Sequence, residues 1–173
     1  SRYKPERGKD KRGITGYEEN KLKFISEKIN TIPEEKNIHK TITKIFNARK
    51  QNINKGTRID WSSAEALAFG SLLEEGYPVR LVGQDSGRGT FSQRHSVLRN
   101  QTDNSRYVPL NNISDSQKQF EIVDSFLSEL AVLGFEYGYS LVEPNTLTLW
   151  EAQFGDFANC LLYTSDAADD VRC

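Results

Sequence analysis

A glutamate followed by two phenylalanines is the part of this sequence best suited to hold a flat, protonatable ring. Glu129 falls in the first turn of a predicted helix (residues 126–139), and Phe154 and Phe157 belong to the run FGDF just after a predicted strand (146–150). A carboxylate at a helix start is stabilised by free backbone N–H groups and by the positive end of the helix dipole. Taken alone, Glu129 is better explained as a surface residue that complements this dipole.

A second candidate is the polar, glycine-bearing loop GQDSGRGTFSQRHSVL, which spans residues 83–98. It follows a short apolar run (78–82) that predicts a strand, and open α/β sheets bind ligands at the carboxyl ends of their strands. Gln84, Asp85 and Arg88 are its candidate ligand-binding residues. The loop has no Walker lysine and no G-x-G-x-x-G spacing, so it carries no phosphate-binding fingerprint.

His95 in the same loop has two interpretations. By itself it is better explained as a structural histidine. The alternative is an active-site imidazole, since a group that titrates near neutral pH can move protons. Asp85 and Arg88 likewise have a structural alternative, which is to pair with each other across the loop.

Around these residues the pattern predicts alternating helices and strands. Apolar spacing predicts helices over 17–29, 39–53 and 60–75, and a strand over 120–123. Asp60 is expected to cap the third helix, with Ser62 and Glu65 as a capping box. The polar run 100–117 is predicted to be a surface excursion. The inner face of the helix 126–139 is expected to consist of Leu127, Leu130, Ala131, Gly134 and Gly138.

Composition narrows the class of protein. The chain has 173 residues with 36 % hydrophobic residues and a net charge of −1, so no global field favours nucleic acid or a membrane surface. No apolar run approaches the ~18 residues of a membrane span, and no signal-peptide pattern opens the chain. The sequence contains no methionine, from which we expect an internal piece of a longer protein.

The two ends of the chain differ from its middle. Residues 1–16 are rich in Lys and Arg without interleaved aromatics, which favours a solvated linker over a nucleic-acid arm. Both cysteines, Cys160 and Cys173, lie in the final run 160–173, which breaks the preceding pattern and is predicted to be a non-native tail. Their absence from residues 1–159 fits a reducing compartment.

Four long runs carry a resemblance to a known family. They are IDWSSAEALAFGSLLEEG, VGQDSGRGTFSQRHSVL, LSELAVLGFEYGYS and LTLWEAQFGDFAN. With these runs, residues 15–159 resemble the E1 components of 2-oxoglutarate dehydrogenase complexes, from the end of a linker into the pyrimidine-binding domain. Leu130 departs from the family pattern, where many members have Glu or Phe. A larger departure begins at Cys160, where the family continues through a glycine and a long helix.

The resemblance implies a three-layer α/β/α fold with a mostly parallel sheet, as in transketolase-like pyrimidine domains, incomplete at its C-terminus. The implied divisions are a basic linker (1–16), a helical linker segment (17–56), the first part of the pyrimidine-binding domain (57–159) and the tail (160–173). The implied cofactor is thiamine diphosphate. Its Mg²⁺ and diphosphate would be held by a domain absent from this chain, and no metal site is expected here.

The resemblance also implies roles for individual residues. Glu129 would hydrogen-bond the ring nitrogen of the cofactor's aminopyrimidine, and Phe154 would stack on that ring with Phe157 beside it. Gln84, Asp85, Arg88 and His95 lie on the loop expected to line the site, with His95 as a candidate catalytic group. We expect Glu129 to share a proton with the ring, because burial beside apolar rings disfavours a bare carboxylate.

The implied activity is that of a succinyl-transferring 2-oxoglutarate dehydrogenase of the tricarboxylic acid cycle. Such an enzyme decarboxylates 2-oxoglutarate and passes the succinyl group to the lipoyl domain of an E2 succinyltransferase. We expect a homodimer in the bacterial cytoplasm or mitochondrial matrix, no nucleic-acid or membrane partner, and no activity from this chain alone. Two alternatives stay open, namely another thiamine diphosphate-dependent 2-oxo acid decarboxylase or dehydrogenase and a non-catalytic binding module.

Overall fold

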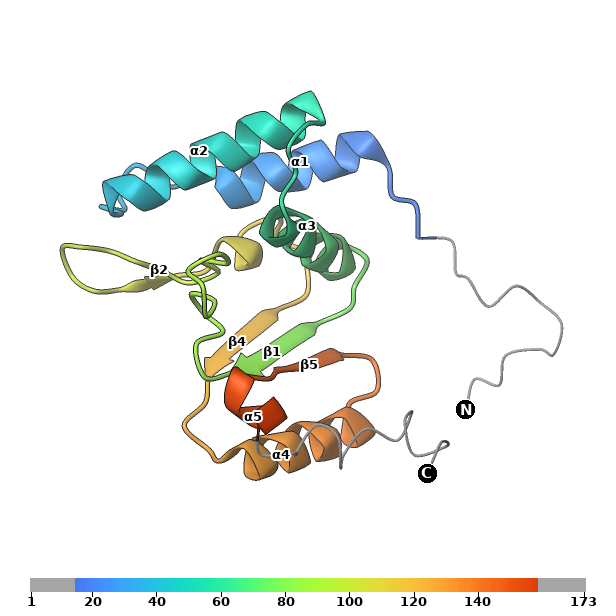
Figure 1. Ribbon diagram of the computed structural model, residues 1–173. Coiled ribbons are helices and arrows are strands. Elements are labelled where there is room, and N and C mark those ends of the chain that lie inside the picture. Colours follow the sequence, from blue (N-terminus) through green and yellow to red (C-terminus); the bar gives the residue numbers. More distant parts are fainter. Residues whose placement is uncertain (1–14, 159–173) are drawn as a thin grey trace, which may run out of the picture.

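A fully buried strand, β1 (Val79–Gly83), lies at the centre of the computed structural model, which describes residues 15–158. It pairs in parallel with β4 (Phe120–Asp124) on one side and with β5 (Leu147–Glu151) on the other, giving the strand order β4-β1-β5. Strand β1 is buried on both faces because helices cover both sides of the sheet (Figure 1). The predicted α/β fold is confirmed.

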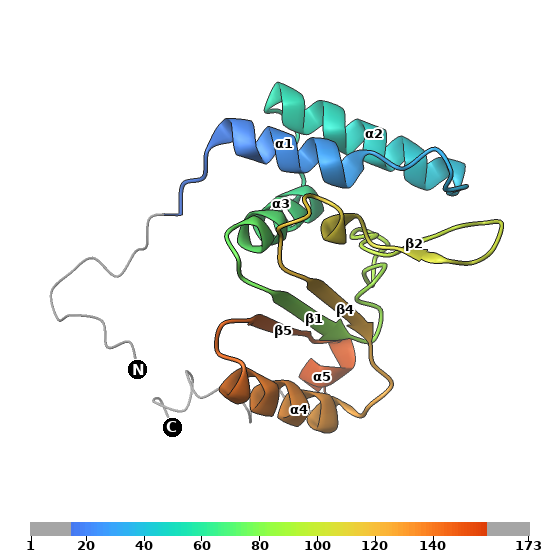
Figure 2. The same cartoon turned by 180° about the vertical axis from the view of Figure 1, so that it is seen from behind.

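Within residues 15–158, five α-helices form the outer layers. On one side of the sheet lies α3 (Trp61–Glu74), with α1 (Glu19–Asn30) and α2 (Lys40–Lys55) packed beyond it. On the other side lie α4 (Glu129–Val142) and the short α5 (Phe154–Ala158), as the view from behind also shows (Figure 2). The sheet is therefore the middle of three layers, and its carboxyl edge is free to carry loops.

The main apolar core lies between the sheet and the helices α1 and α3. Leu73 of α3 and Val79 of β1 are completely buried, and Phe69 stacks on Phe120 of β4 with ring centroids 5.6 Å apart. Gly70 lets α1 approach closely, because a Cβ at this position would lie 2.5 Å from a methyl carbon of Ile25. This core holds β1 and β4 in place beneath α3.

The cap of α3 differs in part from the prediction. Asp60 is the N-cap residue, and its Oδ1 accepts a hydrogen bond of 2.7 Å from the backbone N–H of Ser63. The capping box of Ser62 and Glu65 is wrong, because Ser62 lies inside the helix and Glu65 is bonded to Arg94. Because Asp60 alone caps the helix, the carboxylate of Glu65 is available to pair with the distant Arg94.

The polar run between β1 and β4 is more than a surface excursion. It forms a small antiparallel pair, β2 (Leu98–Arg99) and β3 (Arg106–Tyr107), followed by a 3₁₀ turn at Pro109–Asn111. Leu110 and Ile113 are then buried in the main core, with exposed fractions of 4 % and 2 %. The prediction failed here because two isolated apolar side chains in a polar run give no periodic signal.

Helix α4 begins later and faces differently than expected. It starts at Glu129, three residues after the predicted start, because Ser128 has the extended backbone of an N-cap residue. Its buried side chains are Val132 and Glu136, whereas Leu127 before the helix and Leu130 on it are 53 % and 68 % exposed. The predicted inner face is therefore wrong. The helix is apolar nearly all round, so periodicity did not determine which side faces the sheet.

Candidate functional site

The candidate site lies where the carboxyl ends of the three parallel strands meet. Gly83 at the end of β1 is in register with Asp124 at the end of β4 and with Glu151 at the end of β5. The glycine-bearing loop, the start of α4 and the helix α5 each follow one of these strands. Strand pairing thus brings three segments that are distant in sequence to one edge of the sheet.

Glu129 is the first helical residue of α4, and its side chain is partly exposed. Ser128 precedes it but makes no side-chain hydrogen bond to the helix start. The first backbone N–H groups of α4 therefore have no capping side chain, and they favour negative charge at this end of the helix. A partly exposed carboxylate at such a position can accept a hydrogen bond from a bound group.

The position of α4 depends on a buried ion pair with the central strand. Arg80 of β1 donates from Nε and Nη2 to the two carboxylate oxygens of Glu136, over 2.7 and 2.8 Å. Its Nη1 lies 2.6 Å from a carboxylate oxygen of Glu121 on β4, and the guanidinium also lies over the ring of Tyr139. Arg80 and Glu136 are 9 % and 4 % exposed. The hydrogen bonds to Glu136 are the main cause of a raised pKa for Arg80.

The aromatic side of the candidate site is the short helix α5. Phe154 is 86 % exposed and Phe157 is 48 % exposed, so neither ring is buried by the described residues. Asp156, in contrast, is 1 % exposed and accepts a hydrogen bond of 2.6 Å from the backbone N–H of Gln153. The side chain of Gln153 bonds to Thr90 of the glycine-bearing loop. These bonds fix the turn that presents the two phenyl rings to solvent.

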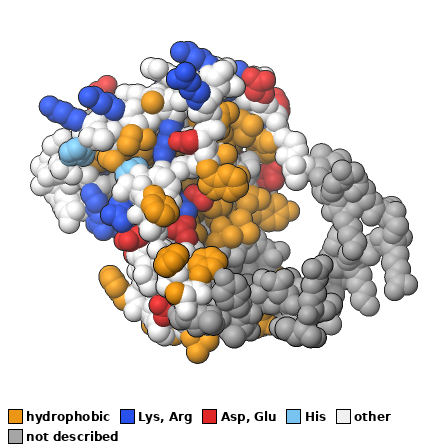
Figure 3. Space-filling view, viewed as in Figure 1, with side chains coloured by type: hydrophobic (Ala, Val, Ile, Leu, Met, Phe, Trp, Pro, Cys, Tyr) orange, Lys and Arg blue, Asp and Glu red, His pale blue; other side chains and the backbone are white. Residues whose placement is uncertain are grey.

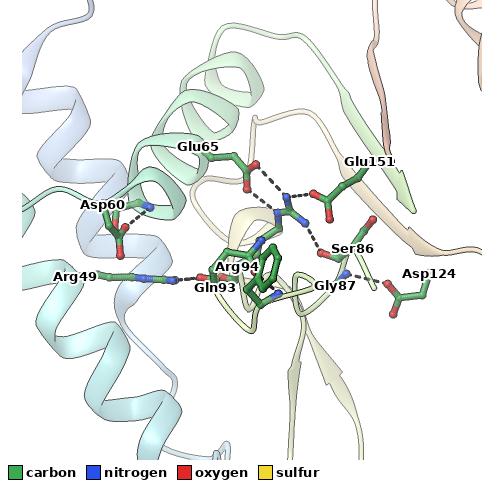
Figure 4. A network of polar contacts seen from close by, with 11 residues as sticks. Arg49, Asp60, Glu65, Ser86, Gly87, Gln93, Arg94, Asp124 and Glu151 are labelled. Carbon is green, nitrogen blue, oxygen red and sulfur yellow. Dashed lines mark hydrogen bonds and ion pairs between the residues drawn. The ribbon is translucent and has the colours of Figure 1, made fainter. Parts of the chain in front are cut away.

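Arg94 ties together the segments behind this edge, as Figure 4 shows. It donates two hydrogen bonds to Glu65 of α3, over 2.6 and 3.1 Å, and one of 2.9 Å to the backbone oxygen of Ser86. It also pairs with Glu151 at the end of β5. Burial lowers the pKa of Arg94, but the two carboxylates outweigh it and the net shift is upward. One buried cation thus joins α3, the loop and β5.

The three predicted ligand-binding residues of the loop are exposed. Gln84 and Asp85 directly follow β1, and Arg88 lies three residues further on. Arg88 pairs with Asp85 at 3.2 Å, which is the structural alternative considered from the sequence. Both side chains are more than half exposed, so this pair contributes little to stability. A binding role for Gln84, Asp85 and Arg88 stays a prediction.

His95 is placed among the helical segments and not beside Glu129. It lines a small cavity together with Phe46 and Arg49 of α2, and its backbone has a positive φ of 53°. Burial lowers the pKa of His95, and the nearby charge of Arg49 lowers it further. A histidine with a lowered pKa at the α2 side of the loop is consistent with a structural role, and a catalytic role for His95 stays a prediction.

Glu129 and Phe154 follow the two outer strands, one on each side of β1. The structure has a groove lined by residues between 87 and 126 and a larger cavity at the opposite edge of the sheet. Neither Glu129 nor Phe154 lines either of them. Within residues 15–158, no group of three or more His, Cys, Asp or Glu side chains is arranged to hold a metal ion. In the same residues, no helix is both long and apolar enough to cross a membrane.

Comparison with known families gives a match to "Transketolase, pyrimidine binding domain" over residues 57–171. This chain belongs to that family. The match ends at residue 171, within the predicted non-native tail 160–173. That tail and residues 1–14 of the predicted basic linker 1–16 lie outside the described residues. The predicted division of the chain into a linker, a helical segment, a domain and a tail stays a prediction.

Among curated proteins, the chain is similar to 2-oxoglutarate dehydrogenase E1 components. It is 56 % identical to that of Rickettsia felis over 146 residues, which cover 84 % of this chain and 15 % of the relative. It is 52 % identical to that of Brucella canis over 149 residues, covering 86 % of this chain and 15 % of the relative. The pyrimidine-binding domain described here is thus a small part of the length of these relatives.

Sequence reasoning missed the residues that position the candidate site in this pyrimidine-binding domain. Four side chains are at least nine-tenths buried and form hydrogen bonds that hold a segment or turn of the site, namely Arg80, Arg94, Glu136 and Asp156. One signal was available: an arginine within the apolar run PVRLV requires a buried partner. Nothing in the sequence identified that partner as Glu136, 56 residues further on.

Proposed function

We propose that this chain supplies the pyrimidine-binding half of a thiamine diphosphate site in a 2-oxoglutarate dehydrogenase E1 component. The proposal rests mainly on Glu129, a partly exposed carboxylate at the uncapped start of α4 within a transketolase-type pyrimidine-binding domain. Two further supports are the exposed ring of Phe154 at the same sheet edge and the similarity to 2-oxoglutarate dehydrogenase E1 components.

The residues at this edge fit a flat heterocycle with a basic ring nitrogen. As an anion favoured by the free N–H groups of α4, Glu129 would accept a hydrogen bond from that nitrogen in its protonated form. Phe154 would cover one face of the ring, since its phenyl group is 86 % exposed and its backbone is fixed by the turn around Asp156. When bound, thiamine diphosphate supplies the nucleophilic carbon that adds to a 2-oxo acid.

The finer assignments belong to the same proposal. The diphosphate and its Mg²⁺ would be held by residues outside this chain, and the succinyl group would pass to the lipoyl domain of E2. A homodimer is supported by the exposed apolar side chains of Leu130, Tyr137 and Leu141 along α4, which are 65–68 % exposed. We place the enzyme in the bacterial cytoplasm or mitochondrial matrix. The 173-residue chain alone is expected to show no turnover.

The test is the variant Glu129→Gln in a full-length E1 chain that carries this segment. Glutamine keeps the size of the side chain but cannot hold or release a proton. We expect decarboxylation of 2-oxoglutarate to fall by about 10²–10⁴-fold, the range for loss of a positioned acid or base. The measurement is the initial rate with saturating thiamine diphosphate and Mg²⁺, together with far-ultraviolet circular dichroism to check folding.

Glu143→Gln is the matched control, because Glu143 is an exposed glutamate at the other end of α4. This variant should retain the wild-type rate. Equal rates for wild type and Glu129→Gln would remove Glu129 from the reaction and with it the proposed site. An equal loss in both variants would show that the helix is merely sensitive to change.

A further inference from the structure

A basic groove lies beside the candidate site, at the carboxyl end of β4. It has a volume of about 470 Å³, within the range of small-molecule sites. Three arginines line it, namely Arg88, Arg99 and Arg106, together with apolar side chains that include Ile122 and Phe126. In Figure 3, Lys and Arg side chains gather on the left of the molecule, in the region where Figure 1 places β2.

Two of these arginines face each other across the small antiparallel sheet. Arg99 of β2 and Arg106 of β3 are direct partners in the strand register. Like charges at directly opposed positions destabilise an antiparallel pair. A hairpin that places both guanidinium groups at one groove therefore carries a repulsion that a bound anion would relieve.

The described residues do not neutralise this pair. Arg99 donates from Nη1 to the backbone oxygen of Asn104 over 3.2 Å, and Arg106 from Nη2 to that of Ile122 over 3.4 Å. Within residues 15–158, neither guanidinium forms an ion pair with a carboxylate. Each arginine keeps N–H groups that are free to bind an oxyanion, for which the planar guanidinium is well shaped.

The acidic groups near the groove are already engaged. Asp124 lines the groove, and its Oδ1 accepts a hydrogen bond of 2.8 Å from the backbone N–H of Gly87. Asp85 pairs with the third arginine, Arg88. One lining carboxylate against three lining guanidinium groups leaves the groove net positive, although the whole chain has a net charge of −1.

The groove also offers an apolar surface. Phe126 is fully exposed, and Ile122 and Val97 contribute to the same lining. A ligand with only charged groups would leave this apolar surface exposed to water. The combination suits a small organic molecule that carries an oxyanion on an apolar or planar body.

We propose that this groove binds the oxyanion group, phosphate or carboxylate, of a small organic ligand, with Arg99 and Arg106 as its principal contacts. Phe126, which lines the groove, lies three residues before Glu129, and Glu129 does not line it, so the ligand would sit next to the start of α4 without using Glu129. Two sources share this chemistry. One is a separate phosphate-bearing ligand, and the other is a carboxylate of a dicarboxylic substrate.

The test measures anion binding to a full-length E1 chain that carries this segment, saturated with thiamine diphosphate and Mg²⁺. The probes are inorganic phosphate and glutarate, titrated by calorimetry and by thermal unfolding at constant ionic strength against sodium chloride. Wild type is expected to bind at least one probe. Arg99→Gln and Arg106→Gln should each weaken that binding about tenfold or more, because each removes hydrogen bonds from a charged group.

Arg58→Gln is the matched control, since Arg58 is an exposed arginine outside the groove, and it should bind like wild type. Without anion, Arg99→Gln should unfold at or above the wild-type temperature, because it removes the opposed charge and leaves the fold intact. Phosphate binding alone identifies a phosphate-bearing ligand. Glutarate binding alone, with a raised KM and unchanged kcat for 2-oxoglutarate in Arg106→Gln, identifies the substrate carboxylate.

Three results would overturn the proposal. They are no binding of either probe, binding that Arg99→Gln and Arg106→Gln leave unchanged, and a response that sodium chloride reproduces at the same ionic strength. A fall in the unfolding temperature of Arg99→Gln without anion would show that the opposed arginines are not in conflict. The calorimetric and thermal-unfolding readouts do not depend on the role of Glu129, whereas the KM and kcat readout rests on the proposed function.

Discussion

Replacing Glu136 by leucine should strongly destabilise this chain, because it leaves Arg80 buried beside an apolar side chain. Glu136 accepts two hydrogen bonds from Arg80, and both residues are more than nine-tenths buried. Removal of one partner from a buried ion pair typically costs about 3–5 kcal/mol. Arg80 keeps Glu121, whose side chain is 45 % exposed, so we expect about 3 kcal/mol, near the lower limit.

The assay is urea unfolding of the 173-residue chain, followed by circular dichroism. The unfolding midpoint should fall while the slope of free energy against urea concentration stays constant. The double variant Arg80→Leu/Glu136→Leu should be less destabilised than Glu136→Leu alone, because it removes the buried charge along with its partner. Glu143→Leu on the exposed end of α4 serves as the control and should change stability by less than ~0.5 kcal/mol.

The reasoning would be refuted if Glu136→Leu had wild-type stability. It would also be refuted if the double variant lost as much as the sum of the two single variants. Additive losses would mean that Arg80 and Glu136 contribute separately and that their pairing does not hold α4 against the sheet.

Two further predictions concern the loop and the cap of α3. Gly89→Ala should lower the free energy of unfolding by about 1–3 kcal/mol, because Gly89 has a φ of +85° and a Cβ there would lie 2.5 Å from Gln93. Gly76 also has a positive φ, but a Cβ there would meet open space. Gly76→Ala should therefore lower the free energy of unfolding by less in the same urea titration. Asp60→Ala should cost about 1 kcal/mol at neutral pH. Burial raises the pKa of Asp60, but the hydrogen bonds from Ser63 and the charge of Arg49 lower it more. Since the folded pKa is depressed, this contribution is complete above the unfolded pKa of about 4 and is lost as pH falls through the folded value. The gap between wild type and Asp60→Ala should therefore close in acid, and a constant gap would contradict this.

Much of the secondary structure could be read from local patterns. Helices α1 to α4 and the three strands of the parallel sheet each overlap a predicted element, and Asp60 caps α3 as expected, whereas α5 was not predicted as a helix. These features depend on a few neighbouring residues: a capping carboxylate, a glycine with positive φ at position 76, or a short β-branched run. Such signals act over one or two turns of chain, and the sequence contains them in full.

The orientation of α4 and the fixing of the loop required the tertiary structure. Helix α4 is apolar on several sides, and the face that packs on the sheet is selected by Arg80, which bonds to Glu136. Arg94 meets Glu65 and Glu151, which are 29 and 57 residues away along the chain. Charge pairs of this kind have no spacing rule, because their geometry is set by strand register and helix packing.

The sequence by itself determined the family, the α/β class and the candidacy of Glu129 and Phe154, since long motifs and local periodicity are written along the chain. Only the tertiary structure decided that the ends of β1, β4 and β5 share one edge, and that Arg99 opposes Arg106 beside it. The physical reason is that parallel pairing and hairpin register join residues through space. Composition and spacing describe neighbours in the chain, and they carry no information on which distant charges will be buried together.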